Sequence, residues 1–141
     1  MPNKRIVLDT NGLISSLSRR GNYYPIWKGF QMGVYTLCVS NEILEEYAEV
    51  IGRKMTPEIA ENVIDLLLKS KNVELVHPQF RLHLITSDPD DNKFDDCAFA
   101  ANATYIVSDD AHFDILKEIP FPPLFVLKLK AFLELLMNDE I

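Results

Sequence analysis

The stretch Ile6-Val7-Leu8-Asp9-Thr10-Asn11 (residues 6–11) runs from three apolar residues directly into an acid. The stretch Tyr105-Ile106-Val107-Ser108-Asp109-Asp110 (residues 105–110) repeats this pattern near the other end of the chain. Short apolar runs predict strands, so each strand would carry carboxylates at its carboxyl end. In an open α/β sheet, ligands bind outside the carboxyl ends of the strands. We therefore expect Asp9 to lie close to the pair Asp109 and Asp110.

Strand-like and helix-like segments alternate along the chain. The strand-like runs cover residues 5–8, 35–40, 73–76, 105–108 and 124–127. Helical spacing of apolar residues covers residues 10–17, 24–32, 41–52, 57–70, 92–101, 112–118 and 130–137. This alternation predicts an α/β fold, with a largely parallel sheet covered by helices on both faces. The length of 141 residues predicts one domain spanning residues 1–141.

Composition narrows the classes of function. The formal net charge of −7 argues against a protein that holds nucleic acid by general electrostatic attraction, although a small basic cluster such as Arg19 and Arg20 could still guide a phosphate backbone. Cys38 and Cys97 lie far apart in apolar segments, which indicates a reduced, cytoplasmic setting. No apolar segment approaches the roughly 20 residues that span a bilayer, so we expect no membrane association.

Helical geometry selects one glutamate from the segment 41–52. Ser40 is the expected N-cap, as Thr56 is for the next helix. At about 100° per residue, Glu46 lies roughly 95° from the centre of the apolar stripe. The other glutamates lie about 135° or more from that centre and are expected to face solvent: Glu42, Glu45 and Glu49. Glu46 is therefore the acid at the rim of the buried face.

The same calculation ranks the acids around the helix at 92–101. Asp91 lies roughly 70° from the centre of its apolar stripe, Asp95 about 110° and Asp96 about 150°. This favours Asp91 as a site residue, makes Asp95 a supporting acid and predicts that Asp96 is exposed. An alternative role also fits Asp88, Asp90 and Asp91, because Asp side chains in turns and at helix starts accept hydrogen bonds from free backbone N–H groups.

Acids gathered at one edge of a sheet build a site for hard divalent cations. Mg²⁺ or Mn²⁺ held there can activate water and stabilise a displacement at phosphorus. A calcium loop starting at Asp88 is excluded, because Lys93 and Phe99 occupy the positions that an EF-hand requires to be Gly and Glu. His112 could lie near such a metal, but a hydrogen-bonded structural role is the expectation for a lone histidine.

The order of these motifs resembles the PIN-domain family, in particular its branch of toxin components of toxin–antitoxin modules. The resemblance runs from Arg5 to about Phe113. It is carried by the apolar strand followed by Asp-Thr-Asn, by Ser-x-x-Ile-Leu-x-Glu, by Asp-Pro-Asp-Asp-Asn-Lys-Phe before an alanine-rich helix, and by Ile-Val-Ser-x-Asp. The resemblance implies a three-layer, Rossmann-like α/β/α sandwich. It also implies a ribonuclease that depends on Mg²⁺ or Mn²⁺, with RNA as substrate and an antitoxin protein as partner, and it allows a homodimer.

The resemblance places the family's acidic ligands on Asp9, Glu46, Asp91 and Asp110. Asn11 and Ser108 match the small polar positions beside them. Asp109 departs from the pattern, and we favour Asp110 because a group one residue beyond the strand is better placed to turn over the sheet edge. Asp90 and Asp95 remain alternatives to Asp91.

Two other functions are consistent with parts of the pattern. A haloacid-dehalogenase-like phosphohydrolase also begins with a strand ending in Asp, and it would use Asp9 as a nucleophile. That class needs a second acid two residues later, where this chain has Asn11. In the second alternative, the acids at the sheet edge bind a metal or a basic partner without catalysis. The negative net charge of the chain is consistent with this alternative.

Overall fold

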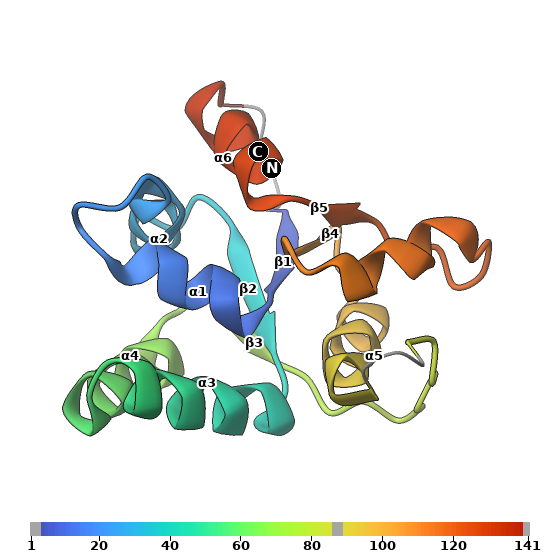
Figure 1. The fold of residues 1–141 in the computed structure, drawn as a ribbon, viewed down its shortest axis with the longest axis horizontal. Helices are drawn as coiled ribbons and strands as arrows, with labels where there is room; N and C mark the ends of the chain where they lie inside the picture. Colours follow the sequence, from blue (N-terminus) through green and yellow to red (C-terminus); the bar gives the residue numbers. More distant parts are fainter. Residues whose placement is uncertain (1–3, 86–88, 140–141) are drawn as a thin grey trace.

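The computed structural model describes residues 4–85 and 89–139, so Asp88, predicted to stabilise a turn or helix start, lies outside the described residues. Its centre is a five-stranded sheet with the order β3-β2-β1-β4-β5 (Figure 1). All four strand pairs are parallel, which confirms the predicted sheet. The strands are β1 (Arg5–Leu8), β2 (Thr36–Val39), β3 (Val73–Leu75), β4 (Tyr105–Val107) and β5 (Val126–Leu127).

The helices follow the predicted order closely. They are α1 (Thr10–Leu17), α2 (Tyr24–Gln31), α3 (Asn41–Lys54), α4 (Pro57–Lys69), α5 (Asn92–Ala101) and α6 (Leu129–Met137). Two 3₁₀ segments complete the fold, η1 (Pro89–Asp91) and η2 (Ala111–Glu118), the second in place of the predicted α-helix at 112–118. Ser40 and Thr56 are the N-caps of α3 and α4, as expected. Over the described part of the chain, no helix has the length and apolar character needed to cross a membrane.

The connections between strands produce three layers. The helices α1 to α4 lie in the connections that lead from β1 towards β3, whereas α5 and η2 lie in those that lead to β4 and β5. Because such crossovers are right-handed, the two groups cover opposite faces of the sheet, which confirms the α/β/α arrangement. Helix α5 packs against β1, β2 and β4, and α6 packs on α2. Figure 1 shows α3 and α4 side by side at the lower left and α5 at the lower right.

Aromatic contacts fix the elements on either side of the sheet. Tyr35 meets Phe132 of α6 edge to face, with ring centroids 5.2 Å apart. Phe94 of α5 meets Phe113 of η2 in the same way, with centroids 6.0 Å apart. All four side chains are buried. The second contact holds the start of η2 beside the start of α5, and both of these segments carry acids predicted for the site.

Two polar side chains of α5 bind the segment that precedes it. The Asn92 amide donates to Ile85 O at 3.0 Å and accepts from Ile85 N at 2.8 Å. One turn later, Asp96 Oδ1 accepts from Leu82 N at 2.9 Å. The prediction that Asp96 is exposed is therefore wrong, because residues 82–85 lie along α5 and leave Asp96 only 3% exposed. Its carboxylate stabilises this segment instead of facing solvent.

The side chain of Tyr47 joins α3 to the end of β1. Its hydroxyl donates to Leu8 O at 2.5 Å, and the residue is fully buried. Leu8 directly precedes Asp9, so this hydrogen bond fixes the backbone from which the predicted site begins.

Replacing Tyr47→Phe should lower the free energy of unfolding by about 1–3 kcal/mol, because the buried Leu8 carbonyl loses its donor. Urea unfolding followed by circular dichroism measures this change. Tyr24→Phe, at a partly exposed tyrosine of α2, is the control and should change stability little. Equal effects of the two substitutions would contradict the structural role given to the Tyr47 hydroxyl.

Candidate functional site

The carboxyl ends of β1 and β4 lie side by side at the centre of the sheet. Leu8 is paired with Val107, and Asp9 N donates to Val107 O at 3.1 Å. This pairing places Asp9 next to the segment Ser108 to Asp110, although the two are 99 or more residues apart in sequence. The expectation that these acids lie close together is met at this edge.

Asp9 is a buried carboxylate, 6% exposed, at the start of α1. Its Oδ1 accepts from Gly12 N at 2.7 Å and its Oδ2 accepts from Ser108 Oγ at 2.5 Å. Burial raises the pKa of Asp9 to about 6; the two hydrogen bonds oppose that rise, and the nearby charges of Asp110 and Asp109 add to it. A side chain at position 12 would place its Cβ only 2.7 Å from Asp9 Oδ1, so glycine is required for this close approach.

The adjacent acids Asp109 and Asp110 have different surroundings. Asp109 Oδ1 accepts from Leu129 N at 2.9 Å and so binds the first residue of α6. Asp110 N donates to Ser108 Oγ at 2.9 Å, which links this residue to Asp9 through one hydroxyl group. Asp110 Oδ1 also accepts from His112 N at 2.9 Å. The geometry therefore favours Asp110 over Asp109 as the acid that lies with the site.

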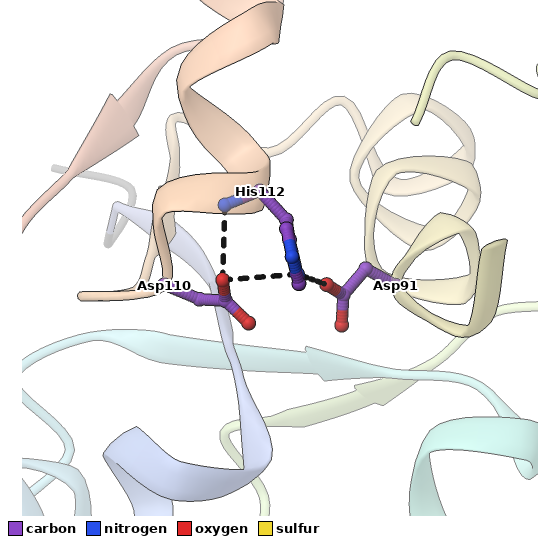
Figure 2. Close-up of side chains that lie close together, drawn as sticks. All are labelled: Asp91, Asp110 and His112. Carbon is purple, nitrogen blue, oxygen red and sulfur yellow. Dashed lines mark hydrogen bonds and ion pairs between the residues drawn. The ribbon is translucent and has the colours of Figure 1, made fainter. Parts of the chain in front are cut away.

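Asp91, Asp110 and His112 form a compact group (Figure 2). His112 Nδ1 lies 3.1 Å from Asp110 Oδ1 and 3.2 Å from Asp91 Oδ2. One donor atom from each of the three residues lies within 4.8 Å of the others, and the three could hold a metal ion together. Asp91 occupies the N-cap position of α5 without a side-chain capping hydrogen bond, and Asp90 is exposed, so Asp91 is the better placed of the two.

Sequence reasoning gave His112 a structural role and did not place it among the site residues. The structure places it between Asp91 and Asp110, the two carboxylates at the starts of α5 and η2 that the sequence had selected (Figure 2). The only signal available was its spacing, two residues after Asp110. The contact with Asp91 depends on how η2 packs on α5, which spacing alone does not show.

Glu46 of α3 is bound by two groups. Its Oε2 accepts from the hydroxyl of Thr10, and its Oε1 lies 2.9 Å from Lys93 Nζ. The side chain is 26% exposed, in agreement with its predicted place at the rim. Nearby, Asn11 Oδ1 accepts from Lys54 Nζ at 3.1 Å. The remaining glutamates of α3 are exposed as expected: Glu42, Glu45 and Glu49.

Asp95 is fully buried one turn after Asp91, and neither of its carboxylate oxygens has a hydrogen-bond partner in the described structure. The pKa of Asp95 is raised to about 7, mainly by burial and to a smaller extent by the neighbouring acids Asp96 and Asp91. Helical geometry placed Asp95 about 110° from the centre of the apolar stripe, yet its side chain is completely buried. The compact donor group does not include it.

Of the four predicted ligands, the structure brings Asp91 and Asp110 into the compact group with His112. Asp9 joins them through Ser108. Glu46 is linked through its contacts with Thr10, which follows Asp9, and with Lys93, which follows Asp91 by two residues. The acids thus occupy one edge of the sheet, where Lys93 at the start of α5 pairs with Glu46.

Asp95→Asn should make folding less sensitive to pH. The folded chain keeps the Asp95 proton up to about pH 7, whereas the unfolded chain loses it near pH 3.8. The bound proton therefore stabilises the folded chain fully below about pH 4, and this stabilisation is lost as pH rises through about 7. The variant should gain about 1–3 kcal/mol relative to the parent at pH 8. Thermal unfolding between pH 5 and 8 measures the change, with Asp65→Asn, at an exposed acid of α4, as the control. Parallel pH profiles for parent and Asp95→Asn would contradict the assignment.

Comparison with solved structures shows the same fold in several toxin–antitoxin proteins. VapBC2 from Rickettsia felis, solved bound to a DNA fragment from its promoter, has a TM-score of 0.61 at 17% identity, covering 88% of this chain and 98% of that one. VapBC-1 from nontypeable Haemophilus influenzae has a TM-score of 0.59 at 16% sequence identity, and the match covers 89% of this chain and 98% of that one. VapC20 from Mycobacterium tuberculosis is a toxin that cleaves the sarcin–ricin loop. It has a TM-score of 0.57 at 14% sequence identity, and the match covers 77% of this chain and 92% of that one.

No protein with a curated description matches this sequence. The sequence pattern of the PIN domain, in contrast, matches residues 5–112, which contain every acid of the candidate site. That match covers most of the chain and agrees with the parallel sheet and its acidic edge. The chain therefore belongs to the PIN domain family.

Proposed function

We propose that this protein is an endoribonuclease dependent on Mg²⁺ or Mn²⁺ and that it is the toxin of a toxin–antitoxin pair. The observation that carries the proposal is the compact group of Asp91, Asp110 and His112 beside Asp9. These residues lie at the carboxyl end of a parallel sheet, where α/β proteins bind their ligands. Membership of the PIN domain family supports the same activity.

The donor set suits a hard divalent cation. Carboxylate oxygens are the ligands that Mg²⁺ and Mn²⁺ prefer, and an imidazole nitrogen is compatible with Mn²⁺. Adjacent ligands of an octahedral ion are about 3 Å apart, since each lies about 2.1 Å from the metal. The separations of 3.1 and 3.2 Å from His112 Nδ1 to the two carboxylates agree with that spacing. We propose Asp9, Asp91 and Asp110, with His112 beside them, as the groups that hold the ion, and Glu46 as the fourth acid of the site, paired with Lys93.

A bound ion would supply positive charge for the scissile phosphate and lower the pKa of water. The chain's own groups prepare the site for that charge. Ser108 holds Asp9 and Asp110 in fixed positions through one hydroxyl, and Gly12 N fixes the second oxygen of Asp9. Because the pKa of Asp9 is raised to about 6 by burial, this carboxylate is ionised only above that pH in the absence of a cation.

RNA and an antitoxin are the partners we propose. The structures that share this fold include a toxin that cleaves the sarcin–ricin loop and two VapBC proteins. The net charge of −7 gives no general attraction for RNA, so contacts with phosphates would come from cations near the site, including Lys54 and Lys93. An antitoxin could inhibit the enzyme by placing an arginine against the carboxylates. A cytoplasmic location and a homodimer belong to the same proposal.

The phosphohydrolase alternative has less support. It needs an acid two residues after Asp9, and Asn11 at that position accepts a hydrogen bond from Lys54. It predicts hydrolysis of small phosphate esters such as p-nitrophenyl phosphate, whereas we expect none. The non-catalytic alternative predicts metal binding without cleavage of any RNA.

Asp91→Asn should reduce divalent-dependent RNA cleavage by at least about 100-fold, because the charge that holds the ion is lost while the shape of the side chain is kept. Cleavage of a labelled RNA with Mn²⁺ or Mg²⁺, and with EDTA to remove the ion, measures the effect. Asp114→Asn is the control, since this exposed acid of η2 pairs with Lys128 at 3.3 Å. Cleavage that persists in EDTA, or in Asp91→Asn, would contradict the proposal.

Asp9→Asn should also abolish cleavage, yet it should unfold at the same or a higher temperature than the parent in metal-free buffer at pH 8. The substitution removes a desolvated charge and keeps an oxygen that can accept from Gly12 N. Thermal unfolding and the cleavage assay, made on the same preparation, separate the two effects. A strong loss of stability together with activity would show that Asp9 is needed for folding.

Metal affinity should fall as pH decreases from 7.5 to 5.5, because protons and the ion compete for Asp9. Titration calorimetry with Mn²⁺ at the two pH values gives the ratio of dissociation constants. Asp9→Asn should reduce this pH dependence. An affinity for Mn²⁺ that is the same at both pH values would argue that Asp9 is not among the groups that bind the ion.

A further inference from the structure

Lys93 places a positive charge at the acidic edge, the part of the sheet edge that carries Asp9, Glu46, Asp91 and Asp110. Its side chain is 13% exposed, and its ammonium lies 2.9 Å from Glu46 Oε1. The same nitrogen donates to Asp90 O at 2.7 Å and lies 5.7 Å from the centre of the Phe94 ring. Three neighbours therefore fix the ammonium between α3 and the start of α5.

This position is unfavourable for a lysine unless the contacts compensate. Lys93 is the second residue of α5, and the amino end of a helix disfavours positive charge because unpaired N–H groups point outward there. Removing an ammonium from water also costs free energy unless it is paired. The contact with Glu46 supplies that pairing, so the lysine is held in place by the acid and not by its own helix.

Both oxygens of Glu46 are engaged by the protein. Oε2 accepts from the Thr10 hydroxyl and Oε1 pairs with Lys93. The donor atoms that come within 4.8 Å of one another belong to Asp91, Asp110 and His112 instead. The edge thus has two parts, an acidic group that could accept an ion and a glutamate whose charge is already balanced.

We propose that Lys93 is a built-in cation that occupies the place of a second divalent ion at Glu46, so that each chain binds one ion. The inference rests on the proposed function, since it concerns the number of ions in that site. In enzymes that use two ions, the ions lie about 3.5–4 Å apart. An ion bound by Glu46 would have to approach the ammonium closely, and the repulsion between the two cations opposes its binding.

The test counts bound Mn²⁺ by titration calorimetry and by the electron paramagnetic resonance signal of free Mn²⁺. The parent chain should bind one ion. Lys93→Met removes the ammonium and should raise the number to two. Lys93→Gln, which keeps a group able to donate to Glu46, serves as a second variant in case the methionine disturbs folding, and it should also take up a second ion. Lys93→Arg keeps the charge and should stay at one.

Two matched controls separate the specific contact from a general change of charge. Lys54→Met removes the same charge from a lysine that contacts Asn11 instead of a carboxylate, and the count should stay at one. The double variant Lys93→Met with Glu46→Gln removes the freed acid as well, so its count should return to one. Circular dichroism confirms that each variant is folded before the titration.

Three results would overturn the inference: two ions in the parent, one ion in both neutral variants of Lys93, or a second ion that persists in the double variant. The proposed function fails in a different way. A parent chain that binds no Mn²⁺ would reject both proposals, whereas one bound ion with no cleavage of any RNA would reject the nuclease and support the ion count.

Discussion

The parallel pairing of β1 with β4 is the constraint on which the rest of the site depends. These strands are neighbours at the centre of the sheet, but the chain builds two further strands and five helices between them. The chain leaves β1 towards β2 and leaves β4 towards β5, so the strand order reverses at this pair of strands. Asp9 at the end of one strand and Ser108 at the end of the other meet through a side-chain hydrogen bond. The remaining acids come from α3 and from the starts of α5 and η2.

The site gathers negative charge in a region where burial makes charge costly. Asp9 and Asp95 show that cost most clearly, since burial raises the pKa of both well above the value in water. The protein reduces the cost for Asp9 with two hydrogen bonds and for Glu46 with a hydroxyl and an ammonium. Asp95 receives no such partner in the described structure. Under the proposed function, a bound cation would add stability to this edge.

Much of the fold could be predicted because the apolar periodicity of each segment is clear. The strands and helices lie within a few residues of their predicted bounds, and the stripe of α3 placed Glu46 at the rim correctly. The exposure of Asp96 could not be predicted, because residues 82–85 lie along α5 through backbone contacts that leave no periodic signal. The places of His112 and Lys93 depend on contacts between elements far apart in sequence. Single histidines and lysines carry no pattern from which such contacts can be read.

In the loop after β4, the adjacent acids Asp109 and Asp110 contact two different parts of the molecule. One acid fixes the first residue of α6, a helix that packs on α2, and the next acid faces the candidate site. Two adjacent side chains can keep contacts on opposite sides only if the backbone between them has one fixed conformation. Insertions or deletions at this loop would therefore displace the terminal helix and the acidic edge together. Variation in loop length among relatives should accumulate elsewhere on the surface.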